Sequence, residues 1–156
     1  MRPLAALACV ALISVVAAAV PLSPLTRLAG KYIHKFKNGD VEGDTYYTTD
    51  VVEIVPLDAH RAEVSFYLNF FNGHDCSVDG IAKLEGRKLV YRDTLEGMPN
   101  LPECRLEIWR DARNLYWEDR GTCSFHCGAR GGLHNGRMSA ATRRPMRTRH
   151  ADAADD

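Results

Sequence analysis

The chain has 156 residues, a length that predicts a single domain, because two independent hydrophobic cores would leave too little chain for either. It carries 20 Lys and Arg residues and 20 Asp and Glu residues, so its formal net charge is zero. A near-neutral composition gives no electrostatic argument for a nucleic acid or an anionic membrane as partner.

The first residues have the pattern of a secretory signal peptide. Arg2 supplies a positive charge, an apolar run rich in alanine and valine extends from Leu4 to Val20, and Ala17 to Ala19 form a small-residue cleavage site. The sequence therefore predicts a signal peptide over 1–19 and export to the periplasm or the medium, with no stable membrane span after cleavage. The alternative is an uncleaved membrane anchor, for which the run is short and no basic cluster follows.

The clearest regular element after the leader is a strand from Ala62 to Phe71, where hydrophobic and polar side chains alternate with a period of two. Asn72 and Gly73 follow, a dipeptide that tolerates the positive φ angles of a tight turn. The return strand is expected from Cys76 to Leu84. These segments form the best-defined hairpin of the sequence.

Further segments combine alternation with β-sheet propensity and are separated by turn residues. They are Lys31 to Phe36, Tyr46 to Leu57, Lys88 to Arg92, Cys104 to Trp109 and Leu115 to Asp119. No helical period appears in the predicted mature domain. About seven to eight sequential strands predict an all-β fold, an antiparallel meander that closes into a small barrel, with a two-layer sandwich as the alternative.

The predicted boundaries of this domain follow from composition. The disulfide-stapled β domain is expected over 28–138. Residues 139–156 contain almost nothing apolar and are expected to form a disordered tail, because they cannot bury enough surface to offset the entropy of ordering.

Four cysteines follow the leader, and an exported chain is expected to pair them in two disulfides. In a meander, alternate strands begin at the same end of the sheet, so cysteines at those positions meet at one rim. This argument favours Cys104 with Cys123 and Cys76 with Cys127, and it leaves the two other pairings open.

A metal site is the competing interpretation of the same cysteines. Cys123, His126 and Cys127 put three soft ligands within five residues, and Cys104 could complete a tetrahedral set. An oxidising compartment favours disulfides over thiolates, and the paired knuckles of common zinc modules are missing. The prediction therefore includes no metal and no cofactor.

Candidate contact residues flank the cysteines. Glycines surround Arg130 in the segment after Cys127, which would hold a guanidinium at the stapled rim. His74 and Asp75 precede Cys76, and His126 precedes Cys127, so the preferred pairing gathers all of them. Together they could bind an anion or a partner protein. Alternatively, they only satisfy the turn backbone or pair locally.

Catalysis is disfavoured by the sequence. The Gly-x-Ser-x-Gly elbow is absent, the histidines fall in separate predicted turns or near the termini, and the acidic residues occupy outward strand positions where solvated charge is ordinary. We therefore predict a protein that is not an enzyme. Several aromatic residues are expected to face outward and to mark a recognition surface, unless the register places some of them in the core: Tyr46, Tyr47, Tyr67, Phe71 and Trp109.

The segment from about Gly30 to Met138 resembles a group of small exported bacterial proteins. The resemblance rests on Asn72-Gly73-His74-Asp75-Cys76, on Cys104-Arg105-Leu106 and on Cys123-x-x-x-Cys127-Gly128-Ala129-Arg130-Gly131. It implies a barrel of the calycin type and an association with lysozyme-inhibitor-like domains. It carries over no catalytic residue.

Three functional hypotheses follow. The leading one is an exported binding protein of the bacterial cell envelope, an inhibitor of lysozyme-like enzymes that acts through the rim. The second is a carrier of a small apolar ligand in the barrel interior, where Phe66, Leu68, Phe70 and Leu106 are expected to point. The third is a hydrolase, which would need a cleft with perturbed histidine or carboxylate chemistry.

Overall fold

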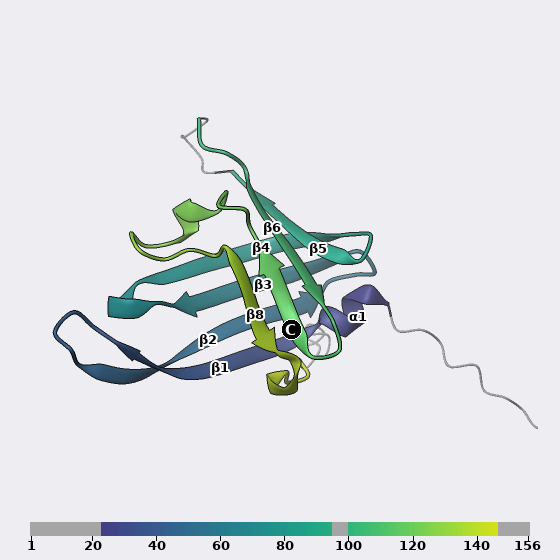
Figure 1. The fold of residues 1–156 in the computed structure, drawn as a ribbon. Coiled ribbons are helices and arrows are strands. Elements are labelled where there is room, and N and C mark those ends of the chain that lie inside the picture. Colours follow the sequence, from purple (N-terminus) through teal and green to yellow (C-terminus); the bar gives the residue numbers. More distant parts are fainter. Residues whose placement is uncertain (1–22, 95–99, 147–156) are drawn as a thin grey trace, which may run out of the picture.

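The computed structural model describes residues 23–94 and 100–146, so the predicted signal peptide and the end of the predicted tail lie outside the described residues. One short helix precedes the strands, and three single-turn 3₁₀ helices, η1 to η3, connect or follow them (Figure 1). In chain order, the elements are α1(Pro24–Leu28), β1(Gly30–Gly39), β2(Thr45–Pro56), β3(Arg61–Asn69), η1(Phe71–Gly73), β4(Asp75–Glu85), β5(Lys88–Asp93), β6(Cys104–Arg110), β7(Asn114–Glu118), η2(Ser124–His126), β8(Asn135–Ser139) and η3(Ala140–Thr142).

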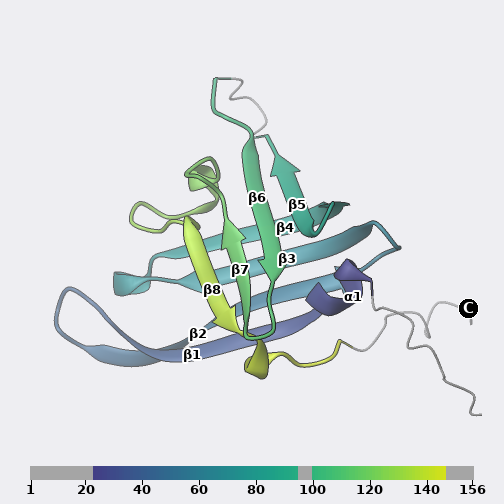
Figure 2. The ribbon, with the colours of Figure 1, turned by 45° about the vertical axis from the view of Figure 1, so that its right-hand side comes forward.

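The eight strands form one antiparallel sheet in sequence order, which confirms the predicted all-β meander. The long strands β1 to β4 form one layer, and β6 to β8 cross over it at a steep angle (Figures 1 and 2). The backbone N–H of Lys31 donates to the carbonyl of Arg144 at 3.0 Å, and the N–H of Arg144 returns a bond of 2.8 Å. This bridge joins β1 to the segment after β8 and nearly closes the barrel.

The hydrophobic core lies between the two layers. Along β3, Ala62, Val64, Phe66 and Leu68 are buried while their neighbours face outward, as the period of two predicts. The ring of Phe66 meets Trp117 of β7 edge-on, with 5.5 Å between the ring centroids. The aromatic contact thus ties the first layer to the second.

The turn between β3 and β4 has the positive φ angles expected of Asn72 and Gly73, which are 62° and 70°. It is longer than a two-residue hairpin, because η1 lies within it and the N–H of Phe70 donates to the carbonyl of His74 at 2.7 Å. The extra residues bring the Phe71 side chain to the surface at this end of the barrel.

Strand β8 and helix α1 are not among the predicted elements. Strand β8 is five residues long, and Met138 is its one buried residue, so alternation has too few positions to be visible. Its pairing depends on β7, where Trp117 lies opposite Gly136. Helix α1 precedes the predicted domain start and buries Leu25 and Leu28 against the core, with Ser23 as its N-cap.

The fold also continues past the predicted boundary at residue 138. Helix η3 follows β8, Arg144 pairs with β1 through its backbone, and Arg143 Nε donates to the carbonyl of Ala29. The prediction of a disordered tail from residue 139 is therefore wrong for the described part of that segment. The prediction was based on the lack of apolar residues, but backbone pairing and hydrogen bonds from arginine to carbonyl groups hold the segment in place.

Candidate functional site

Two disulfides staple one end of the barrel. Cys76 is bonded to Cys127 and Cys104 to Cys123, with Cα atoms 4.0 and 4.4 Å apart. This is the preferred pairing of the sequence argument, and it is confirmed. The four cysteines of the described residues are all in disulfides, and no group of three or more potential metal ligands occurs in this part of the chain.

The start of β4 and the segment after Cys127 lie side by side. The N–H of Gly128 donates to the carbonyl of Asp75 at 2.8 Å, next to the bridge between Cys76 and Cys127. A Cβ on Gly131 would lie 3.0 Å from that carbonyl oxygen and 3.1 Å from Cys76 Sγ, so glycine permits this close approach. The structure therefore brings His74 and Asp75 to the glycine-rich segment, as the cysteine pairing predicts.

Arg130 is exposed within this segment and has no carboxylate within 4.0 Å among the described residues. The alternative role of Arg130 was an ion pair with a nearby carboxylate. That ion pair is not formed among the described residues. The Arg130 guanidinium is free to contact a partner.

His126 takes a different position from the other predicted contact residues. Its ring is 4.4 Å from that of Phe125 and 6.0 Å from that of Tyr91, and its side chain is 15% exposed. Its Nε2 lies 3.4 Å from Asp93 Oδ2 and has no hydrogen-bond partner. Burial of the Tyr91 side chain, followed by the negative charge of Asp93, raises the pKa of Tyr91 to about 12. The Tyr91 phenol therefore stays neutral. His126 is therefore largely buried against aromatic rings, unlike the exposed Asp75 and Arg130.

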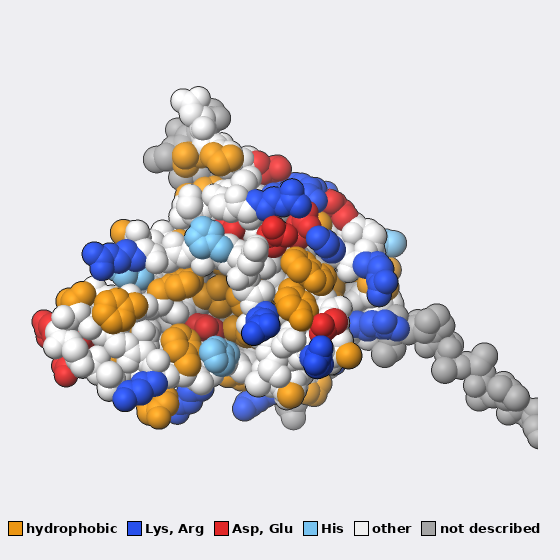
Figure 3. Space-filling view, in the orientation of Figure 1, with side chains coloured by type: hydrophobic (Ala, Val, Ile, Leu, Met, Phe, Trp, Pro, Cys, Tyr) orange, Lys and Arg blue, Asp and Glu red, His pale blue; other side chains and the backbone are white. Residues whose placement is uncertain are grey.

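Exposed hydrophobic side chains occupy the same end of the molecule. Tyr47 is 71% exposed and Phe71 is 51% exposed, and Val41 is exposed in the turn between β1 and β2. Figure 3 shows hydrophobic side chains at this end, on the left of the view. We use the name aromatic rim for the following residues: Val41, Tyr46, Tyr47, Phe71, His74, Asp75 and Arg130.

Hydrogen bonds fix the aromatic rim. Asn38 Nδ2 donates to the carbonyl of Phe70 at 2.7 Å, and the N–H of Gly73 donates to the hydroxyl of Tyr46 at 3.1 Å. Both bonds tie the β1–β2 hairpin to the turn that precedes β4. Trp109 lies elsewhere: it is half-buried on β6 and stacks on Tyr116, with 5.7 Å between ring centroids.

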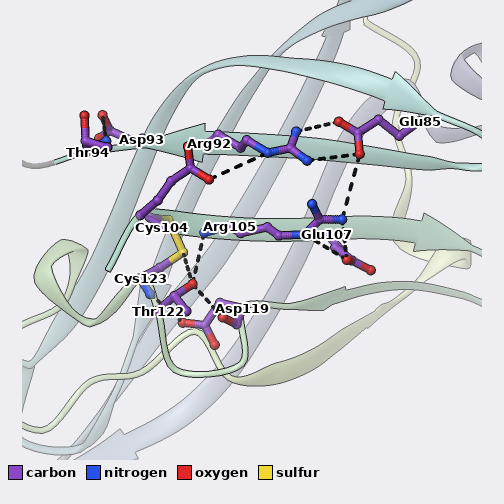
Figure 4. A network of polar contacts seen from close by, with 11 residues as sticks. Glu85, Arg92, Asp93, Thr94, Cys104, Arg105, Glu107, Asp119, Thr122 and Cys123 are labelled. Carbon is purple, nitrogen blue, oxygen red and sulfur yellow. Dashed lines mark hydrogen bonds and ion pairs between the residues drawn. A yellow bond between two sulfur atoms is a disulfide. The ribbon is translucent and has the colours of Figure 1, made fainter. Parts of the chain in front are cut away.

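A polar network covers the outer face of β4 to β6 (Figure 4). Its central residue, Glu107, is 8% exposed, so the expectation that acidic strand residues are solvated is wrong at this position. Lys88 Nζ donates to Glu107 at 2.5 Å, and Arg105 donates to it at 2.8 Å. Arg92 pairs with Glu85 through both carboxylate oxygens. The charges are matched within the network, which stabilises the sheet.

Hydrogen bonds from Lys88, followed by those from Arg105, lower the pKa of Glu107 from its ordinary value to about 2. Because the folded-state pKa is the lower one, the stabilisation is present above the ordinary pKa of about 4.3 and is lost as the pH falls toward 2. We expect Glu107→Gln to reduce the free energy of unfolding by about 2 kcal/mol at pH 7, after allowance for the exposure of both cations.

The measurement is urea denaturation of both proteins from pH 7 to pH 2. The difference between wild type and Glu107→Gln should narrow below about pH 4. Glu103→Gln is the control, because Glu103 is an exposed member of the network, 3.8 Å from Arg92. A difference that stays constant over this pH range would contradict the assignment to Glu107.

Asp119 is a structural residue that the sequence analysis missed. It is 1% exposed, and its carboxylate accepts hydrogen bonds from the N–H groups of Gly121 at 2.9 Å and Cys123 at 3.2 Å. Both Arg120 and Gly121 have positive φ angles. Asp119 thus shapes the turn that delivers Cys123 to its disulfide. The sequence signal was the turn pattern of Asp119 and Gly121, which ends two residues before that cysteine.

Comparisons with protein-family models, with curated proteins and with solved structures find no match. The resemblance to small exported bacterial proteins stays a prediction. Within the described part of the chain, no helix has the length and apolar character needed to cross a bilayer.

Proposed function

We propose that the protein is an exported binding protein without enzymatic activity that acts in the bacterial cell envelope through the aromatic rim, and that its target is a lysozyme-like enzyme. The observation that carries this proposal is the exposure of the aromatic side chains of Tyr47 and Phe71 at the end of the barrel where Asp75 and Arg130 are also exposed. Aromatic and arginine side chains are the residues that contribute most to protein–protein binding.

The rigidity of the aromatic rim supports a role in recognition. The hydrogen bonds from Asn38 and Gly73, together with the Cys76–Cys127 disulfide, hold its backbone before any partner arrives. A preorganised surface loses little conformational entropy on binding, so more of the contact energy appears as affinity.

The disulfides support export, because disulfides form and persist in oxidising compartments. Two polar groups of the fold are already engaged in structural contacts, which favours binding over catalysis. His126 is covered by aromatic rings, and the Glu107 carboxylate is paired with the cations of Lys88 and Arg105.

The hypothesis of an apolar carrier has less support. Of the four side chains predicted to point inward, Phe66, Leu68 and Leu106 are buried in one cluster with Trp117, and Phe70 is partly buried against it. The interior of the described barrel is thus occupied by its own side chains, as is usual for a small barrel.

The test is a turnover assay of cell-wall lysis by a lysozyme-like enzyme with the purified mature protein. Micromolar wild-type protein should slow lysis, and Tyr47→Ser and Phe71→Ser should each weaken inhibition about thirtyfold, because hot-spot side chains are worth about 2 kcal/mol. Ile81→Ser is the matched control, since Ile81 is exposed on β4 outside the aromatic rim.

An unchanged lysis rate at micromolar wild-type protein would refute the inhibitor role. Affinity purification from envelope extract tests the broader proposal of a binding protein. A partner that is retained by wild type and by Ile81→Ser, and lost with Tyr47→Ser, would support it. Equal retention by all of these variants would contradict the assignment to the aromatic rim.

A further inference from the structure

We propose that a groove beside helix α1 binds a small anion that carries two or more phosphate or carboxylate groups. We call this the arginine groove and define it by its charged residues: Arg27, Arg87, Arg110, Asp111, Arg113 and Arg137. This site goes beyond the proposed function, because it lies at the opposite end of β4 from the aromatic rim. Asp75 begins that strand, and Arg87 lies two residues after its last residue, Glu85.

The fold gathers these arginines from distant parts of the sequence. Arg27 belongs to α1, Arg87 to the turn between β4 and β5, and Arg113 to the turn between β6 and β7. Arg110, the last residue of β6, lines each of the three adjacent hollows that make up the groove. Figure 3 shows Lys and Arg side chains gathered around α1, on the right of the view.

Arg110 is anchored in a fixed position at the centre of the groove. One of its terminal nitrogens donates to the carbonyl of Arg27 at 2.8 Å, and its Nε is buried without a hydrogen-bond partner. The buried Nε is closed to solvent, so an anion in the groove would meet the remaining terminal N–H groups of this guanidinium.

The charge of the groove is unbalanced. In the network on β4 to β6, Arg92 and Arg105 are paired with glutamates, but no described carboxylate lies within 4.0 Å of a side-chain nitrogen of any groove arginine. Asp111 is already engaged, since it accepts from the backbone N–H groups of Arg113 and Asn114, both at 2.7 Å. The groove is therefore lined by arginines that have no carboxylate partner among the described residues, which favours an anionic ligand.

The dimensions and chemistry of the groove indicate the class of ligand. The hollow lined by Arg110, Arg113 and Arg137 has a volume of about 790 Å³, which is within the range of small-molecule sites. The planar fork of a guanidinium matches the oxygens of a carboxylate or a phosphate. Because the arginines are distributed along the groove, a ligand with more than one anionic group fits it best.

The experiment is isothermal titration calorimetry of the purified protein at low ionic strength, with inorganic pyrophosphate and citrate as separate probes. At least one of them should bind, and the stronger binder identifies phosphate or carboxylate as the preferred group. Arg113→Gln and Arg137→Gln should each weaken binding about tenfold, since each removes one charge-assisted contact. Both residues are exposed, so the variants should fold.

Arg120→Gln is the matched control, because it removes an exposed arginine outside the groove by the same substitution. It should leave the affinity within about twofold of wild type, a change below about 0.5 kcal/mol. An absence of binding heat with both probes would overturn the proposal. So would an equal loss of affinity in Arg120→Gln and the groove variants, because that result would mean attraction by overall charge. Neither outcome depends on the lysis assay.

Discussion

Joint replacement of Cys76 and Cys127 by alanine is expected to lower the free energy of unfolding by about 4 kcal/mol. This disulfide joins residues 51 positions apart, so its removal releases a long loop in the unfolded chain. The same change at Cys104 and Cys123, which are 19 positions apart, should cost about 3 kcal/mol. The first disulfide also attaches the segment that carries Arg130 to the start of β4.

The measurement is guanidinium denaturation of the two double variants and of wild type, followed by far-ultraviolet circular dichroism. Both cysteines of a pair are replaced together, so that no free thiol remains to exchange. A loss below about 1 kcal/mol for the pair at 76 and 127 would show that this bridge does not constrain the unfolded chain.

Gly136→Ala is expected to lower the free energy of unfolding by about 3 kcal/mol. A Cβ at this position would lie 2.0 Å from atoms Cε2 and Cζ2 of the Trp117 indole. The indole is held in place, because its Nε1 donates to the carbonyl of Leu133 at 3.0 Å and its ring meets Phe66. The added methyl group therefore forces a backbone shift between β7 and β8.

Gly128→Ala is the matched control, since a Cβ there would meet its nearest atom, His74 Nδ1, at an ordinary 3.5 Å. Thermal unfolding of both variants gives the comparison. In a Trp117→Ala background the cost of Gly136→Ala should fall sharply, because the clashing ring is gone. Additive effects of the two substitutions would contradict this account of the contact.

The sequence by itself determined the strand pattern of the meander, and it favoured the observed cysteine pairing over the two other pairings. Alternation along Ala62 to Phe71 needs only neighbouring residues, and it set both the strand and the buried face. The cysteine pairing followed from the same pattern, because an antiparallel meander brings alternate strand starts to one end of the sheet. The prediction that His74 and Asp75 lie beside the segment containing Arg130 used this argument, and the structure has that arrangement.

The tertiary structure alone decided which charged groups meet. A neutral composition gave no reason to expect a basic surface, but the crossing of the two layers gathers arginines beside α1. The tertiary structure also buries Glu107 between Lys88 and Arg105, and it packs the ring of His126 against Phe125. Periodicity describes which face of a strand is buried, whereas these contacts depend on how a sheet twists and closes, which is set by long-range packing.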